Sequence, residues 1–183
     1  MKTKNLFIIA CLLLCSVAKA QNQQTSRWRF GIGLETGVPT NFNHNRPLLS
    51  NSKFELGGTA RLQYSINKSA AFTLTSGYYN LFLSPRPMNS PEFNPYGNWY
   101  AGDQGIIPVK GGLKLFIKDG FYVMGEAGAG FETRYFKDTK LILSPGVGFA
   151  TRKWDFGLRY ENFSGQRNNY GLVGLRVAYG FGL

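Results

Sequence analysis

Apolar and polar residues alternate along most of the chain after residue 20. The pattern is clear near the start, where single small or polar residues separate Trp28, Phe30, Ile32 and Leu34. A period of two indicates β-strands, since successive side chains of a strand point to opposite faces. No window has the apolar spacing of a helix. The alternation predicts eight strands, at 27–38, 54–66, 70–83, 105–117, 121–132, 141–151, 154–163 and 170–183.

The connections between these segments alternate strictly between short and long. Each segment also has at least the roughly 9 to 11 residues that a tilted strand needs to cross a bilayer. Short hairpin turns at one end and long loops at the other are typical of outer-membrane barrels with an even number of strands. We therefore predict an all-β, eight-stranded, antiparallel up-and-down transmembrane barrel. Its short turns are 67–69, 118–120 and 152–153, and its long loops are 39–53, 84–104, 133–140 and 164–169.

The two residue sets produced by the alternation differ sharply. One is apolar and contains no charge, whereas the other mixes glycine, serine and threonine with six basic and five acidic residues. Eight strands enclose a lumen just wide enough for side chains, and charges buried there have to be paired. We therefore place the charged set inside and the apolar set against lipid; residues 121–132 are hardest to divide because glycine and alanine blur the two faces. The predicted lumen charges are Arg29, Glu35, Glu55, Arg61, Lys110, Lys114, Glu126, Asp155, Arg159, Glu161 and Arg176.

Aromatic residues are concentrated near both ends of the predicted strands. Aromatic side chains favour the membrane interface, where one end is apolar and the other is hydrated. An alternative explanation is that aromatic residues are common in any β protein. The outward position of these residues favours two girdles at the membrane interfaces. The turn-side girdle would hold Trp28, Tyr64, Phe72, Phe121 and Trp154, and the loop-side girdle Phe54, Tyr78, Phe82, Phe131 and Tyr160.

Residues 1–20 have the three parts of a secretory signal. Lys2 and Lys4 precede an apolar run over 6–14, and residues 18–20 form a small-x-small cleavage site. The run is too short for a transmembrane helix, and Cys11 and Cys15 fit a lipoprotein signal poorly. We expect a signal peptide at 1–20, cleavage after Ala20, and one barrel domain at 21–183.

Cleavage would change both the cysteine content and the charge of the chain. Cys11 and Cys15 would leave with the signal, which excludes disulfides and thiol chemistry in the mature protein. The formal charge would fall from +11 to +8, with 18 basic residues against 10 acidic ones. In an exported chain this charge favours anionic lipid or polysaccharide over nucleic acid.

Basic residues are also in excess on the predicted loop side, by seven to four. Lipopolysaccharide phosphates would be suitable partners for them, and a merely solvated basic rim is an equally good interpretation. The seven basic residues are Arg46, Lys53, Arg86, Arg134, Lys137, Lys140 and Arg167, and the four acidic ones are Glu92, Asp103, Glu132 and Asp138.

The mature chain resembles the small outer-membrane β-barrel proteins of Gram-negative bacteria, including the porin-family and OmpA/OmpX-type eight-stranded barrels. The resemblance is carried by residues 29–37 (RFGIGLETG), 144–149 (SPGVGF) and 174–183 (GLRVAYGFGL). It implies an outer-membrane location, among lipid and lipopolysaccharide, and recognition of the last strand by the barrel assembly machinery. The residues matching that assembly signal are Tyr179, Phe181 and Leu183, where a terminal leucine replaces the commoner phenylalanine.

Few residues suggest chemistry. Enzymes on small barrels of this kind modify lipid A with a histidine near the rim, and this chain offers only His44, with Ser50 or Asp103 as partners. No spacing supports such a site, so we expect no catalytic, cofactor or metal site. The loop over 84–104 is a better candidate, because four prolines stiffen it and it could bind an extracellular ligand or cover the barrel mouth. Its candidate recognition residues are Phe93, Tyr96, Trp99 and Tyr100.

The sequence thus predicts a non-enzymatic outer-membrane barrel with a structural or surface-recognition role through its extracellular loops. Three alternatives stay open: a small-solute channel, a lipid A-modifying barrel enzyme, and a soluble secreted carrier of the lipocalin type. The extracellular ligand of the loops is left open at this point.

Overall fold

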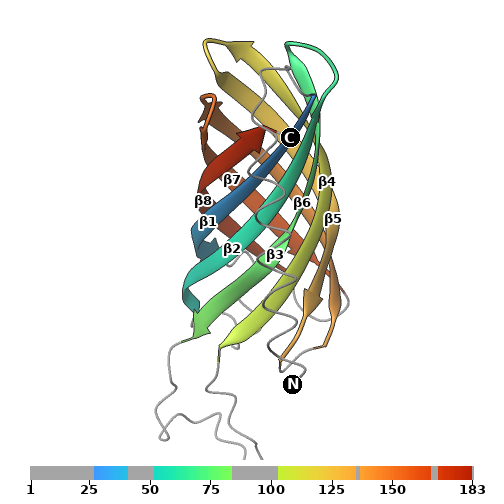
Figure 1. The fold of residues 1–183 in the computed structure, drawn as a ribbon. Coiled ribbons are helices and arrows are strands. Elements are labelled where there is room, and N and C mark those ends of the chain that lie inside the picture. Colours follow the sequence, from blue (N-terminus) through green and yellow to red (C-terminus); the bar gives the residue numbers. More distant parts are fainter. Residues whose placement is uncertain (1–26, 41–51, 84–102, 135–136, 166–168, 183) are drawn as a thin grey trace, which may run out of the picture.

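The chain folds into a closed barrel of eight antiparallel strands (Figure 1). The computed structural model describes residues 27–40, 52–83, 103–134, 137–165 and 169–182. No helix in these ranges is long and apolar enough to cross a membrane. The predicted fold is confirmed, and no strand end differs from its expected position by more than two residues. The strands are β1 (Trp28–Thr40), β2 (Ser52–Ser65), β3 (Ala70–Leu83), β4 (Gln104–Lys118), β5 (Phe121–Glu132), β6 (Thr139–Ala150), β7 (Trp154–Ser164) and β8 (Tyr170–Gly182).

Each strand pairs with its neighbours in sequence, and β8 returns to pair with β1. The closing register matches Glu35 with Arg176, so an acidic and a basic lumen residue lie opposite each other at the seam. The start of β1 and the end of β8 therefore lie at the same end of the barrel. This is the end with the three short turns, at the top of Figure 1. It is called the turn end below, and the opposite end the loop end.

The short turns have sequences suited to tight hairpins. Asp119 and Gly120 both adopt positive φ angles, of 51° and 89°, which is the conformation that an Asp-Gly hairpin turn requires. The β2–β3 turn is stabilised by the side chain of Asn67, whose Oδ1 accepts a hydrogen bond from the Ser69 amide at 2.8 Å. In the β6–β7 turn, Thr151 Oγ1 accepts one from the Trp154 amide at 2.9 Å. Local turn chemistry therefore fixes the register of three hairpins.

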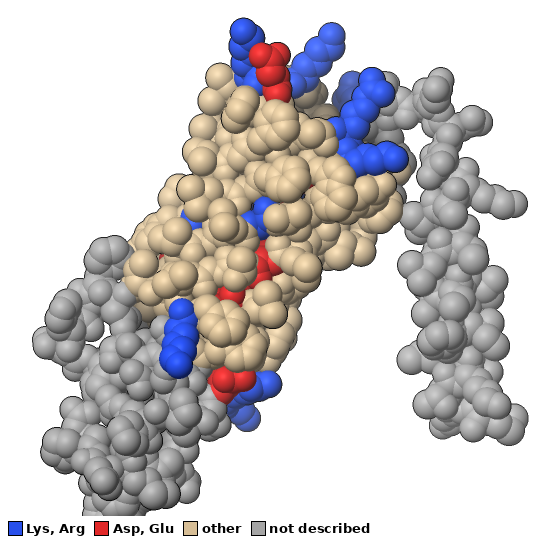
Figure 2. Space-filling view, turned by 90° about the vertical axis from the view of Figure 1, so that its left-hand side faces the viewer, with Lys and Arg blue, Asp and Glu red and all other residues tan. Residues whose placement is uncertain are grey.

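The outer surface of the barrel is apolar. Leu34 is 70% exposed and Leu175 56% exposed, although both lie within strands. Figure 2 shows a surface that is mainly uncharged, with lysine, arginine and acidic side chains projecting at its two ends. Exposed apolar patches of this extent on one molecule indicate a surface that contacts lipid or protein rather than water.

Aromatic rings pair on the outer face near both ends of the barrel. At the turn end, Trp28 packs on Tyr64 with ring centroids 4.7 Å apart, and Phe121 on Phe149 at 5.0 Å. At the loop end, Phe54 stacks on Phe82 at 4.5 Å. These pairs occupy the levels where the sequence predicts interfacial girdles.

Glycines on the inner face allow close approach of bulky lumen side chains. A Cβ at Gly112 would lie 2.6 Å from Glu126 Cγ, and one at Gly57 would lie 2.6 Å from a ring carbon of Tyr79. At Gly111, on the outer face, a Cβ would meet nothing within 4 Å. The glycine-rich inner set thus provides space for the charged and aromatic side chains that fill the lumen.

Candidate functional site

The lumen holds a network of ion pairs, and Glu35 of β1 lies at its centre. Its carboxylate is 1% exposed and contacts two guanidinium groups, those of Arg159 and Arg176. Arg176 Nε donates to Glu35 Oε1 at 3.1 Å, and the hydroxyl of Thr59 donates to the same oxygen at 2.6 Å. One carboxylate therefore links β1, β2, β7 and β8 across the interior.

A second carboxylate, Glu126 of β5, is surrounded in the same way. Arg61 of β2 donates to both of its oxygens, at 3.0 and 3.2 Å. The hydroxyl of Thr75 donates to Glu126 Oε1 at 2.7 Å while accepting a hydrogen bond from Arg61 Nε at 2.8 Å. Lys110 Nζ completes the group at 3.6 Å from Glu126 Oε2. The arrangement satisfies a buried carboxylate with two cations and a hydroxyl.

Towards the loop end, the network continues through Glu161 and Tyr79. Lys110 of β4 pairs with Glu161 of β7, and Arg159 Nε lies 3.2 Å from the same carboxylate oxygen. The hydroxyl of Tyr79 accepts hydrogen bonds from Lys110 at 3.1 Å and from Arg159 at 3.0 Å. Tyr79 therefore lies between the charged middle of the lumen and the apolar residues nearer the loop end.

Towards the turn end, Asp155 of β7 is the central group. Lys114 Nζ donates to its Oδ2 at 2.5 Å, and the hydroxyl of Tyr122 donates to its Oδ1 at 2.6 Å. The ammonium of Lys114 also lies 3.8 Å from the centre of the Tyr122 ring, within the range of a cation–π interaction. The next nearest cations are Arg176 at 3.7 Å and Arg61 at 4.0 Å.

The structure thus gathers the charged residues singled out from the sequence inside one lumen. All of them except Arg29 are at most 8% exposed. Arg29 lies at the turn end, half-buried, and donates to the carbonyl of Thr151 at 3.0 Å. Glu55 differs from the others because neither of its carboxylate oxygens has a hydrogen-bond partner among the described residues.

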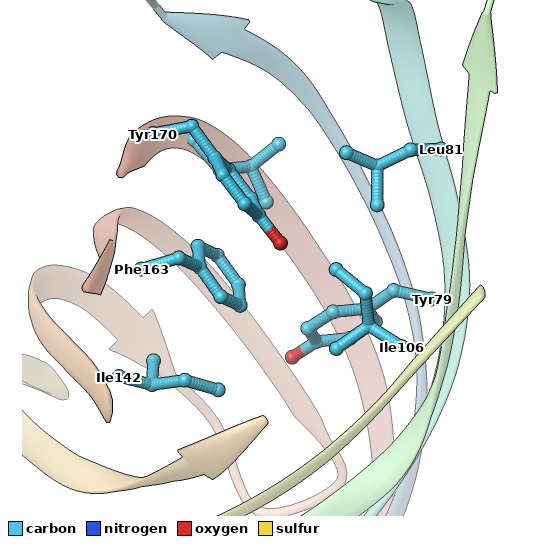
Figure 3. Close-up of a cluster of buried hydrophobic side chains, with 7 residues drawn as sticks. Tyr79, Leu81, Ile106, Ile142, Phe163 and Tyr170 are labelled. Atoms are coloured by element: carbon cyan, nitrogen blue, oxygen red, sulfur yellow. The ribbon is translucent and has the colours of Figure 1, made fainter. Parts of the chain in front are cut away.

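Apolar residues close the lumen near its loop end, and the sequence analysis did not assign them to the inner face. Figure 3 shows these side chains directed toward one another from different strands. The rings of Phe163 and Tyr170 stack at 4.8 Å. All seven side chains of this cluster are at most 4% exposed. We call it the apolar plug; it consists of Tyr79, Leu81, Ile106, Ile142, Phe163, Tyr170 and Leu172.

Two residues expected on the outer basic rim lie inside the barrel instead. Lys140 is 1% exposed and Glu132 7% exposed, and Tyr170 donates to Glu132 Oε1 at 3.3 Å. The expectation was wrong for Lys140 because β6 begins at Thr139 rather than at residue 141. It was wrong for Glu132 because this last residue of β5 has inward parity. Lys140 Nζ lies 3.8 Å from Asp138. The loop-side rim is therefore less charged than the sequence predicts.

Several residues proposed from the sequence lie outside the described residues. They include His44, Ser50, Leu183 and the four aromatic residues Phe93, Tyr96, Trp99 and Tyr100. The signal-peptide region, 1–20, is outside them as well. Asp103 is described, and its carboxylate accepts a hydrogen bond from Asn80 Nδ2 at 3.1 Å. No group of three potential metal ligands occurs within the described ranges.

The described part of the expected assembly signal lies on the outer face of β8. Phe181 is 41% exposed, and its ring meets that of Tyr179 edge-on at 4.9 Å. Tyr179 also packs edge-on against Trp154 of β7 at 5.3 Å. Both side chains are therefore held against neighbouring aromatics at the turn end.

Known structures with the same architecture are outer-membrane or transmembrane barrels. The attachment invasion locus protein Ail of Yersinia pestis is similar over 86% of this chain and 100% of its own, with 16% identity and a TM-score of 0.57. Its structure with the heparin analogue sucrose octasulfate gives a TM-score of 0.56. A de novo designed transmembrane β-barrel is similar over 87% of this chain and 100% of its own, with 12% identity and a TM-score of 0.50. No protein-family model and no curated protein sequence matches the chain.

Proposed function

We propose that this chain is an integral outer-membrane β-barrel, closed to solutes and without enzymatic activity, which acts through its long loops at the cell surface. The observation that carries the proposal is the inverted distribution of polarity: the lumen charges are buried, most of them in ion pairs, and the apolar side chains face outward. A water-soluble barrel would have the opposite arrangement. The shared fold with Gram-negative outer-membrane barrels supports the same location.

Single-cysteine labelling in living cells tests both the location and the orientation. After signal cleavage the chain would contain no cysteine, so an introduced one is the only reactive thiol. Lys137→Cys lies in the β5–β6 connection at the loop end, and Lys118→Cys lies beside the β4–β5 turn, with a side chain 84% exposed. We expect a maleimide too large to pass the outer membrane to label position 137 in intact cells, and position 118 only after permeabilisation.

These two variants are matched controls for each other, since each replaces an exposed lysine, one at either end of the barrel. Labelling of both in intact cells, or recovery of the chain in a detergent-free periplasmic fraction, would refute the membrane assignment. Labelling of position 118 alone in intact cells would mean that the turn end, and not the loop end, faces the medium. Folding is checked by gel mobility before and after boiling, which differs for folded membrane barrels.

A closed lumen is expected to carry no stable current. The apolar plug would block the loop end. In the middle section the charged side chains pair with one another, so they are not available to bind mobile ions. Planar-bilayer recordings of the refolded chain should therefore show no unitary conductance steps. Stable openings that disappear when lumen charges are replaced would favour the small-solute channel instead.

We propose the aromatic residues of the long β3–β4 loop as the recognition surface, with an anionic glycan as the class of ligand. Described basic residues at the loop end, Lys53, Arg134 and Lys137, are exposed and would favour such a ligand. The fold relative Ail has been solved with a heparin analogue, so immobilised heparin is a suitable probe. A variant with serine at Phe93, Tyr96, Trp99 and Tyr100 should fold normally and bind heparin at least about tenfold more weakly, by surface plasmon resonance. Equal binding by the variant and the parent chain would exclude this loop.

A further inference from the structure

A half-open pocket lies at the turn end of the lumen, next to the ion-pair network. Three guanidinium groups and one carboxylate supply its charge, and small residues supply the space between them. It has a free volume of about 20 Å³ for the centre of a water-sized sphere, which exceeds the minimum for one bound water. Its lining residues are Arg29, Gly31, Arg61, Gln63, Asp155, Arg176, Ala178, Tyr179 and Gly180.

The arginines of this pocket have donors that the protein does not use. Four buried nitrogens have no hydrogen-bond partner among the described residues: Arg29 Nη2, Arg61 Nη1 and both terminal nitrogens of Arg176. Arg61 and Arg176 are each only 4% exposed. A buried donor without a partner costs free energy unless water or a ligand satisfies it. Four such nitrogens around one small pocket are therefore an unusual concentration of unused donors.

The carboxylate of the pocket does not neutralise these donors. Asp155 is already bound by Lys114 at 2.5 Å and by Tyr122 at 2.6 Å. Its distances to Arg176 Nη1 and Arg61 Nη1, 3.7 and 4.0 Å, are too long for hydrogen bonds. The pocket lining has three positive charges and one negative charge. Arg61 and Arg176 also pair with Glu126 and Glu35, and Lys114 pairs with Asp155, so one positive charge, that of Arg29, is left over. A net positive pocket with free guanidinium donors matches the chemistry of a small anion.

We propose that this pocket binds one small inorganic anion, of the phosphate or sulfate class, between Arg29, Arg61 and Arg176. Arginine recognises such oxyanions through two parallel N–H donors on one planar group. Gly180 leaves room for the guanidinium of Arg29, since a Cβ there would lie 2.7 Å from Arg29 Nη2. The space beside Gly31 is open, since a Cβ there would lie 4.0 Å from Arg176 Nη2. In the topology proposed above, the pocket opens to the periplasm.

Titration calorimetry on the folded chain in detergent micelles tests the proposal, with inorganic phosphate and sulfate as separate probes in low-chloride buffer. We expect saturable binding with one site per chain. Among the described residues Arg29 has no ion pair within 4.0 Å, so Arg29→Gln removes one guanidinium without breaking one. It should weaken anion binding about tenfold, the effect of one charge-assisted hydrogen bond. Lys118→Gln is the matched control, because it removes an exposed positive charge at the same end, and should leave binding unchanged.

A second variant tests the space instead of the charge. Gly31→Ala keeps all three arginines, and its added methyl group would make only ordinary contacts, of 3.4 Å or more, with the protein. It should fold normally and still weaken anion binding by taking up part of the pocket. Both anions should raise the denaturation midpoint of the parent chain more than that of either pocket variant, since a ligand of the folded state stabilises it.

The proposal is overturned if the parent chain shows no saturable binding. It is also overturned if both Arg29→Gln and Gly31→Ala bind as tightly as the parent, or if Lys118→Gln weakens binding as much as Arg29→Gln, because attraction would then be nonspecific. These outcomes do not depend on the cysteine-labelling result. The proposal of an anion site and the proposal of the membrane orientation can therefore be refuted separately.

Discussion

Glu35→Gln is expected to lower the free energy of unfolding of the barrel by about 3 to 5 kcal/mol. The substitution keeps the size of the side chain but removes the charge that Arg159 and Arg176 share. Two buried guanidinium groups would then face a neutral amide in a low-dielectric interior. Urea titration of the chain folded in lipid vesicles, followed by gel mobility without boiling, measures the loss.

Glu55→Gln is the matched control, with the same chemical change in the same lumen. Glu55 is fully buried, but its carboxylate accepts no hydrogen bond from the described residues. Removing its charge leaves no cation without its partner, so the expected change is within about 1 kcal/mol. A loss of equal size for the two variants would show that burial, rather than the pairing of Glu35, determines stability.

The strands were predictable from the sequence because one face of each had to be free of charge. In β8, for example, Val173, Leu175 and Val177 alternate with Gly174 and Arg176, and a shift by one residue would put Arg176 into lipid. The requirement for a charge-free outer face acts on every strand separately. The position of each strand can therefore be predicted from its own segment of sequence, without knowledge of its neighbours.

The apolar plug was missed because its strands are apolar on both faces near the loop end. Tyr79 follows Tyr78 directly, and Ile106 precedes Ile107, so the alternation is lost where the inner face becomes apolar. Such short continuous apolar runs indicate burial on both sides. These doubled residues were the signal available in the sequence, and they mark where the lumen changes from charged to apolar.

The specific ion pairs could not be predicted, because they depend on the stagger of strands around the barrel. Arg61 and Glu126 lie on β2 and β5, which are not adjacent. Whether two such residues share a level is determined by the shear of the closed sheet, which is a property of all eight strands together. Charge balance can be counted in the sequence, whereas pairing across the lumen requires the three-dimensional structure.

Leu175→Arg is expected to destabilise the barrel in a lipid bilayer by about 2 to 4 kcal/mol, the cost of an arginine on the lipid face near the midplane. Leu175 lies near the middle of β8, opposite Leu158 of β7 and Thr36 of β1, and its side chain is 56% exposed on the outer surface. Urea unfolding in vesicles measures the change. If the outer face met water, as in a secreted carrier, the arginine would be solvated and the change would be close to zero.

Ile117→Arg separates the effect of membrane depth from that of the substitution itself. Ile117 is even more exposed, at 71%, but it lies at the turn end of β4, next to the charged Lys118. An arginine there can reach the interface, so the expected cost is only about 0 to 1 kcal/mol. A large difference between the two variants in bilayers requires a hydrocarbon layer around the middle of the barrel. Equal costs at the two positions would mean that the apolar belt is covered by something other than a bilayer.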